Sequence, residues 1–111
     1  MDWQGFPLID SHDHVQDACF DADRAAVIRR AATAGVRYMV CNGTREADWP
    51  AVLALARDYP EVVPCFGLHP WYVSARSRDW LAVLEDYLRR VPSGVGEIGL
   101  DRWLADRDAK A

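Results

Sequence analysis

The sequence of 111 residues has no apolar run approaching the ~18 residues that a transmembrane helix needs, so we expect no membrane-spanning segment. Its first four residues, MDWQ, show neither the basic nor the apolar region of a secretory signal. Cysteine is scarce, since Cys19, Cys41 and Cys65 are odd in number and lack C-x-x-C spacing. We therefore expect reduced, buried thiols in a cytoplasmic protein. No nucleophilic cysteine is expected, because no base adjoins Cys41 or Cys65 in the sequence.

Positive charge is also in short supply, with 13 Lys and Arg against 17 Asp and Glu and a net charge of −4. Proteins that hold nucleic acid by a broad basic surface carry the opposite balance, so this class is not expected. The balance still permits an enzyme that grips phosphate through bound metal ions, because such ions bring their own positive charge.

What the sequence does contain is the pattern of a folded domain, with 50% hydrophobic and 27% charged residues. Apolar segments near residues 7–12, 36–41, 62–67 and 95–100 alternate with segments of helical period. This alternation predicts an α/β fold of four consecutive βα units with parallel strands, in one partial domain over residues 1–111. Four such units make the first half of a (β/α)8 TIM barrel, which takes about 250 residues. A half-barrel leaves two sheet edges open, and self-association through them is one expectation.

Punctuating residues bound the expected helices. Gly35 is placed to end a first helix over residues 21–34, and Asp48 is placed to cap a second with Pro50 in its first turn. The simplest role for four of the tryptophans is packing in the core or on a helix face: Trp3, Trp49, Trp80 and Trp103.

The segment IDSHDHV, residues 9–15, places two histidines and two aspartates directly after an apolar run. If the strand continues through it, Asp10, His12 and His14 share one face and Asp13 points away. Ligands bind at the carboxyl ends of parallel strands, and two imidazoles spaced in this way can reach one divalent ion, with Asp10 in support. The alternative is a surface turn with incidental histidines.

The segment GEIGLD, residues 96–101, puts a carboxylate inside an apolar strand flanked by glycines. Burying an unpaired carboxylate is costly, so Glu97 needs a partner, which is either a metal ion or a structural ion pair. The glycines allow backbone or ligand to approach closely. Asp101 is either the N-cap of a following helix or a polar group that ligates or supports the metal.

The segment GLHPW, residues 67–71, ends the third predicted strand. His69 either contacts an anionic substrate or stacks with Trp71, or else it is a histidine satisfied by the backbone at a proline turn. Asn42 and Thr44, which follow the second predicted strand, are expected to form its turn.

Three motifs in this order resemble the TatD family of metal-dependent hydrolases, which are amidohydrolase-like TIM barrels: DSHDH, GLHPW and GEIGLD. The resemblance runs from about residue 7 to residue 103. The pattern D-x-H-x-H alone is shared by many amidohydrolases, whereas the combination of G-x-H-P with GEIGLD is much more specific.

The resemblance implies a metal-dependent phosphodiesterase of the deoxyribonuclease type, acting on nucleic acid or a small phosphodiester. It implies that His12 and His14 ligate one metal ion and that Glu97 bridges to a second, with Mg²⁺, Mn²⁺ or Zn²⁺ as candidates. The paired ions would generate hydroxide and stabilise charge on the phosphate. By the same resemblance, His69 lies near the substrate phosphate.

The sequence also departs from the family pattern. The family's barrel continues with two more histidines and an aspartate that ligates metal and helps to activate water, and the 111 residues contain none of them. The chain as it stands therefore matches the N-terminal half and carries an incomplete site, with little or no activity expected. Two alternatives stay open: another metallohydrolase of the amidohydrolase superfamily, and a non-enzymatic half-barrel with a vestigial metal site. The glycine-rich segment around Glu97 speaks against the first.

Overall fold

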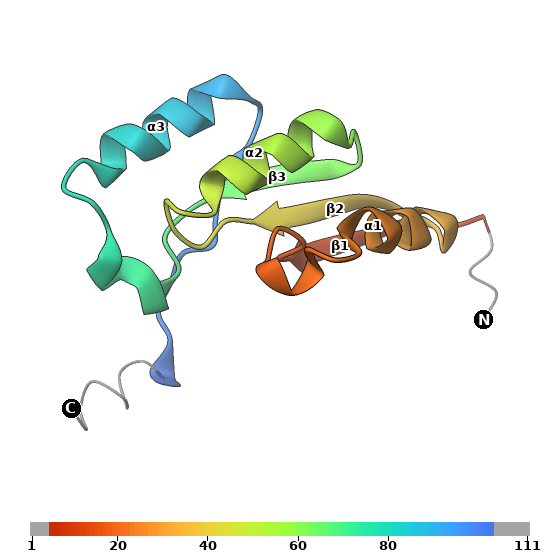
Figure 1. Cartoon of the computed structure of the whole chain (residues 1–111), viewed down its shortest axis with the longest axis horizontal. Helices are drawn as coiled ribbons and strands as arrows, with labels where there is room; N and C mark the ends of the chain where they lie inside the picture. The colour runs from red at the N-terminus through yellow and green to blue at the C-terminus, as the bar shows by residue number, and fades with distance from the viewer. Residues whose placement is uncertain (1–4, 104–111) are drawn as a thin grey trace.

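A computed structural model describes residues 5–103, which form a four-stranded sheet with helices packed against it (Figure 1). The elements are β1 (Leu8–Asp13), the 3-10 helix η1 (Ala18–Phe20), α1 (Arg24–Thr33), β2 (Val36–Asn42), α2 (Trp49–Asp58), β3 (Val62–Phe66), the 3-10 helix η2 (Pro70–Ala75), α3 (Trp80–Arg90) and β4 (Gly94–Val95). The strands lie in chain order, β1-β2-β3-β4, and each neighbouring pair is parallel. The predicted α/β fold of four βα units is confirmed.

The fourth strand is much shorter than the sequence predicts. Strands β1, β2 and β3 lie where the apolar segments place them, but only Gly94 and Val95 pair with β3. The prediction of a strand over residues 95–100 is therefore wrong beyond its first residue. An apolar segment flanked by glycines has the composition of a buried strand, but composition does not say which neighbour its backbone will bond.

Two backbone hydrogen bonds show where the chain goes instead. Gly96 still donates to the carbonyl of Phe66 on β3, at 3.0 Å, but Glu97 donates to the carbonyl of Gly43, at 2.8 Å. Gly43 directly follows β2, so the chain crosses the end of β3 toward β2. The peptide bond between Gly96 and Glu97 is cis.

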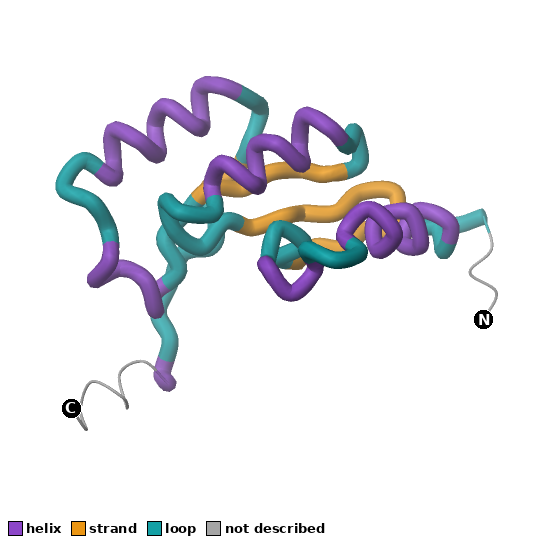
Figure 2. Tube along the Cα trace, viewed as in Figure 1, coloured by secondary structure: helices purple, strands orange, loops and turns teal. Residues whose placement is uncertain are grey.

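The core lies between the helices and one face of the sheet (Figure 2). Cys41 of β2 and Val62 and Phe66 of β3 face the helices and are at most 4% exposed. Trp49, the first residue of α2, is fully buried, and its Nε1 donates to the Gly67 carbonyl at 2.9 Å. Burying a large apolar side chain contributes roughly 1.5–3 kcal/mol, so this layer supplies much of the cohesion of the fold.

The opposite face of the sheet is open. Ile9 of β1, Tyr38 of β2 and Val63 of β3 are 63%, 45% and 37% exposed. Ile9 and Tyr38 are partners in the parallel register, so their side chains lie next to each other. In a closed (β/α)8 barrel this face is packed with side chains from all the strands. The described residues thus form an open half-barrel.

The turns confirm two of the three predicted punctuation residues. Gly35 follows α1 with a φ of +105°, a conformation that favours glycine, and Pro50 lies in the first turn of α2. Asp48 stands at the N-cap position, but its carboxylate accepts hydrogen bonds from the Thr44 backbone N–H and hydroxyl, at 2.9 Å and 2.6 Å, rather than from the helix.

None of the helices described between residues 5 and 103 has the length and hydrophobicity that a membrane-spanning helix requires.

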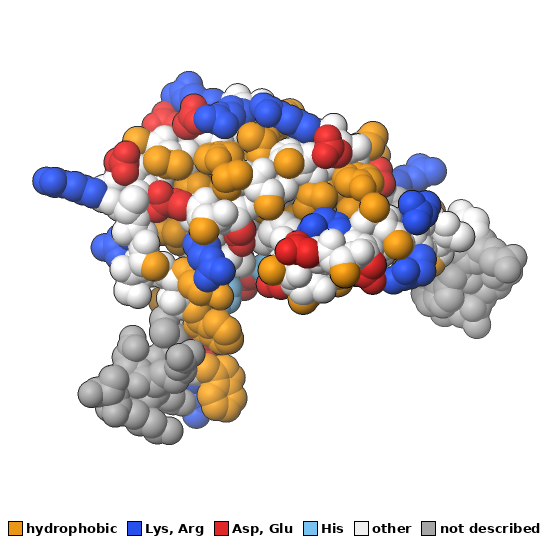
Figure 3. Space-filling model, viewed as in Figure 1, with side chains coloured by type: hydrophobic (Ala, Val, Ile, Leu, Met, Phe, Trp, Pro, Cys, Tyr) orange, Lys and Arg blue, Asp and Glu red, His pale blue; other side chains and the backbone are white. Residues whose placement is uncertain are grey.

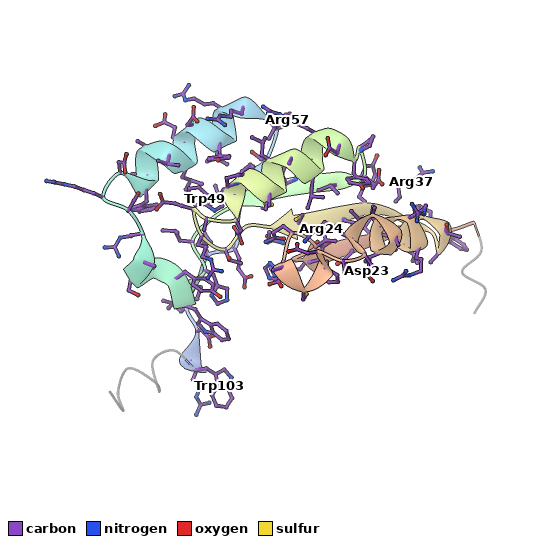
Figure 4. All side chains as sticks on the ribbon, viewed as in Figure 1. Asp23, Arg24, Arg37, Trp49, Arg57 and Trp103 are labelled. Carbon is purple, nitrogen blue, oxygen red and sulfur yellow. The ribbon has the colours of Figure 1, made fainter. Side chains whose placement is uncertain are left out.

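The tryptophans divide between core and surface. Trp49 is buried and Trp80 packs half-buried against the core, as predicted. Trp103 is 72% exposed on the segment beyond β4, away from the helices, so its predicted packing role is wrong (Figure 4). The chain leaves the sheet after Val95 and carries Trp103 out of reach of the core. Trp3 lies outside the described residues.

All three cysteines are free, but they are not all buried. Burial raises the pKa of the Cys41 thiol to about 12, so this thiol stays protonated and inert. Cys65 is half-buried, and Cys19 on η1 is exposed. The prediction of buried thiols is therefore confirmed for Cys41 and wrong for Cys19.

Candidate metal centre

The carboxyl end of β1 and the segment after β4 meet at one point. The Nε2 atoms of His12 and His14 face the same oxygen, Oε2 of Glu97, at 3.2 Å and 3.0 Å. The two imidazole rings meet edge to face with their centroids 5.0 Å apart. The structure thus brings together the three predicted metal ligands, although His12 and Glu97 are 85 positions apart in the sequence.

Glu97 reaches the histidines because glycines let the strand ends come close. A Cβ added to Gly67 would lie 2.7 Å from the Glu97 carbonyl oxygen, and one added to Gly96 would lie 2.8 Å from Asn42 Oδ1. Carbon and oxygen atoms that are not bonded do not approach so closely, so a side chain at Gly67 would displace the backbone of Glu97, and one at Gly96 would collide with the Asn42 side chain. Together with the hydrogen bond to Gly43, this close packing fixes where the carboxylate emerges.

A backbone carbonyl fixes the tautomer of His14. Its Nδ1 lies 2.8 Å from the Asn42 carbonyl oxygen, which can only accept, so Nδ1 carries the hydrogen. The same carbonyl accepts a second hydrogen bond from the buried Gln16 amide at 2.7 Å. In the neutral ring, Nε2 therefore presents a lone pair to Oε2 of Glu97. Two lone pairs that face each other repel, so this contact is favourable only with a proton or a cation between them.

The donor atoms fit a divalent ion. The ligand atoms of His12, His14 and Glu97 all lie within 4.8 Å of one another, close enough to surround one ion at the ~2.0–2.2 Å distances of zinc sites. Two imidazoles and a carboxylate are also the donor types of zinc and manganese sites. The three side chains are 48%, 34% and 25% exposed, so an ion here would keep positions open toward solvent, as catalytic sites do.

The two aspartates of the same segment hold its backbone. Asp10 Oδ1 accepts from the His12 N–H and Asp13 Oδ1 from the Val15 N–H, both at 3.1 Å. Burial is the main cause that raises the pKa of Asp13 to about 6, and the nearby negative charge of Asp10 contributes to this rise. Asp13 therefore lies near Asp10 instead of pointing away from it, because a register shift between the two breaks the strand alternation. The supporting role of Asp10 toward a metal stays a prediction.

His69 joins the cluster from the segment after β3. Its Nε2 lies 3.5 Å from Oε1 of Glu97, the oxygen that does not face the other two histidines. Its Nδ1 accepts the Trp71 backbone N–H at 3.1 Å, so the neutral ring carries its hydrogen on Nε2, directed toward Glu97. The structure combines the two sequence interpretations: the proline turn satisfies one nitrogen, and the other faces the site.

Asp101 has a structural role. Its Oδ2 accepts from Trp71 Nε1 at 2.6 Å, and its Oδ1 accepts from the Trp103 backbone N–H at 2.8 Å. The second bond caps the helical residues 102–103, so the N-cap interpretation is confirmed. Both carboxylate oxygens are thereby committed to groups outside the histidine–glutamate cluster.

Two contributors were not found from the sequence. Asn42, expected only as a turn former, is 6% exposed and orients His14 through its carbonyl, and Gln16 supports that carbonyl. Gln16 left a signal, because it follows the histidine segment directly. Asn42 left none, because every residue carries a backbone carbonyl.

The close packing of the glycines generates a first test. Gly67→Ala is expected to weaken Mn²⁺ binding about 10- to 100-fold, the range for loss of a positioning group, because the new methyl group displaces the Glu97 backbone. Gly94→Ala is the matched control, since its Cβ would meet only the movable Sγ of Cys65, at 3.0 Å. Calorimetric titration on variants shown by circular dichroism to be folded measures the difference. Equal Mn²⁺ affinity in both variants would contradict this account of how Glu97 is placed.

Comparisons with known proteins identify relatives of this chain. A family profile described as TatD related DNase matches residues 9–111. YjjV of Escherichia coli strain K12, named as an uncharacterized metal-dependent hydrolase, is 35% identical over 93% of this chain and 45% of its own length. The deoxyribonuclease TATDN3 of Homo sapiens is 30% identical over 87% of this chain and 39% of its own length.

Two further matches extend the comparison. The 3'-5' ssDNA/RNA exonuclease TatD of Erwinia tasmaniensis is 36% identical over 74% of this chain and 32% of its own length. The crystal structure of E. coli YjjV superimposes with a TM-score of 0.76, covering 93% of this chain and 45% of that one. The chain spans less than half the length of these relatives. From the profile match, the shared fold and the histidine–glutamate cluster, the chain belongs to the TatD family of metal-dependent hydrolases.

Proposed function

We propose that this chain carries the first part of a metal-dependent phosphodiesterase centre of the deoxyribonuclease type, in which His12, His14 and Glu97 hold divalent metal. The observation that supports it is the convergence of two imidazole Nε2 atoms on one oxygen of Glu97, at 3.2 Å and 3.0 Å, at the carboxyl end of a parallel sheet. The printed names of the human and Erwinia relatives, a deoxyribonuclease and an exonuclease, support the reaction class.

Each residue has a separate task in this proposal. His12 and His14 bind through Nε2, and the Asn42 carbonyl keeps His14 in the tautomer that can ligate. When bound, divalent ions lower the pKa of water toward neutrality and offset the negative charge of a phosphodiester. His69 carries its hydrogen on Nε2 beside Glu97, so it can donate to a phosphate oxygen there.

The two oxygens of Glu97 support a proposal of two ions. Its Oε2 faces His12 and His14, whereas its Oε1 lies on the side of His69, 3.5 Å from that ring. A carboxylate whose oxygens face different groups can bridge ions about 3.5–4 Å apart, the separation found in two-metal hydrolases. We propose two ions, with Mn²⁺ or Zn²⁺ at the nitrogen-rich position and Mg²⁺ suited to an oxygen-rich one.

The proposed substrate is nucleic acid or a small phosphodiester. A net charge of −4 supports recognition at a local site rather than over a broad surface.

A cytoplasmic location is part of the proposal, and it is supported by three cysteines that are all free.

Metal binding is the direct test of the ligand set. The double variant His12→Ala/His14→Ala and the single variant Glu97→Gln are each expected to reduce Mn²⁺ or Zn²⁺ affinity below calorimetric detection, because each removes donor atoms from the cluster. Glu85→Gln is the matched control, since Glu85 is exposed on α3 and pairs with Arg89. Unchanged metal affinity in the double variant would sink the assignment of these ligands.

The 111-residue chain alone is expected to show little or no nuclease activity. It contains three histidines in all, and the further histidines and the aspartate of the family's complete site are absent. The measurement follows a labelled single-stranded oligonucleotide over hours with Mn²⁺ or Mg²⁺, using Glu97→Gln to reveal contaminating nuclease. Cleavage by the unmodified chain that EDTA stops and that Glu97→Gln lacks would contradict this expectation.

The open half-barrel supports a proposal of self-association with a second copy of the chain. Strands β1 and β4 are the two edges of a parallel sheet, so two copies related by a two-fold axis would supply eight strands and cover Tyr38 and Val63. Light scattering is expected to give twice the 12.5 kDa chain mass. Val63→Lys should restore the monomer, and Leu81→Lys, at an exposed site on α3, should not. A monomer mass for the unmodified chain at high concentration would refute the pairing.

A further inference from the structure

A groove opens beside the histidine–glutamate cluster, between the loops that follow β1, β2 and β3. His14 and His69 line its side nearest the cluster, and Arg45, Trp71 and Tyr72 also line it. Histidine atoms are visible at the inner corner where the C-terminal segment leaves the body of the molecule (Figure 3). In (β/α)8 enzymes these loops bind the substrate, yet Arg45, the exposed Trp71 and the half-buried Tyr72 have no part in holding metal.

Arg45 supplies a cation to this groove. Its guanidinium lies over the ring of Tyr72, 4.1 Å from the centroid, and it belongs to none of the ion pairs found between residues 5 and 103. The neighbouring Asp48 carboxylate is engaged by the Thr44 backbone and hydroxyl. Stacking on an aromatic ring fixes the plane of a guanidinium while its edge N–H donors stay available to an anion.

Acidic residues limit what the groove can accept. Asp17 accepts a hydrogen bond from the Cys19 backbone at 2.8 Å, and Asp21 pairs with Arg24, so both are committed to the fold. Their charges still repel an extended phosphodiester backbone lying along the groove. The groove therefore suits one phosphate at Arg45 and an uncharged, planar group elsewhere.

Trp71 offers a rigid surface on which such a planar group can stack. Its side chain is 47% exposed, yet Nε1 is held by Asp101 at 2.6 Å and the backbone N–H is held by His69 at 3.1 Å. The indole also meets the His69 ring edge to face, with centroids 5.2 Å apart. An aromatic ring that is fixed but half exposed is a pre-organised stacking platform, because little side-chain freedom is lost when a ligand binds.

We propose that this groove binds the nucleotide next to the scissile phosphate, with its base stacked on Trp71 and its phosphate paired with Arg45. The inference rests on the proposed function, because it places the scissile phosphate at the cluster of His12, His14 and Glu97. A base stacks on Trp71 only when it is not paired in a duplex, so the ligand is single-stranded. Stacking tolerates every base, so the groove selects strandedness rather than sequence.

The test uses calorimetry to measure how tightly a thymidine trinucleotide binds to the 111-residue chain in the presence of EDTA. Trp71→Ala and Arg45→Gln are each expected to weaken binding about 10-fold, and Trp71→Phe is expected to retain most of it. Arg45→Gln should also reduce the slope of log affinity against log salt by about 0.7, the value for one phosphate contact on a single strand. The matched controls are Trp103→Ala and Arg57→Gln, which change an exposed tryptophan and an exposed arginine outside the groove lining (Figure 4).

The outcomes separate this inference from the proposed function. Weakened trinucleotide binding with unchanged Mn²⁺ affinity in Trp71→Ala and Arg45→Gln supports the groove as a nucleotide site. No binding by the unmodified chain at millimolar trinucleotide, equal affinity in all variants, or equal affinity for a blunt duplex overturns it. Loss of Mn²⁺ binding from the unmodified chain would count against the metal centre alone, since the trinucleotide titration contains no metal.

Discussion

The hydrogen bond from the Glu97 N–H to the Gly43 carbonyl, at 2.8 Å, is the contact on which the rest of the site depends. It draws the segment after β4 across the end of β3 and sets a carboxylate beside two histidines at the other end of the chain. A Cβ on Gly67 would collide with the backbone of this segment, and a Cβ on Gly96 would collide with the Asn42 side chain. Gly67 and Gly96 therefore act by permitting close packing rather than by making the chain flexible.

The same contact couples the site to the hydrophobic core. A Cβ on Gly43 would lie 2.7 Å from Cδ1 of Trp49, and the indole N–H of that tryptophan holds the Gly67 carbonyl at 2.9 Å. The fully buried Trp49 thus sets the spacing of the two loops between which Glu97 must pass. Since a packed core resists small displacements, the position of the carboxylate inherits its rigidity from α2 rather than from its own exposed segment.

The sequence pattern predicted those features that depend on neighbouring residues in the chain. The period of apolar residues placed β1, β2 and β3, and the two-residue spacing of His12 and His14 placed both rings at one strand end. The early end of β4 was not predicted, because the choice between β3 and Gly43 as hydrogen-bond partner depends on packing between distant segments. The prediction that Asp13 points away from Asp10 was wrong for a similar reason, since a register shift depends on the pairing of two strands.

The acidic composition is compatible with the proposed polyanionic substrate, because electrostatic effects fall off with distance. Fields from surface carboxylates are largely screened beyond about 10 Å at ordinary ionic strength. Within that range the chain itself contributes the negative charges of Glu97, Asp10 and Asp13, which a divalent ion would offset when bound. Arg45 adds a positive charge at the adjoining groove, which Asp17 and Asp21 also line. The proposed attraction of a phosphate to the strand ends therefore depends on bound metal and on Arg45 rather than on the net charge of −4.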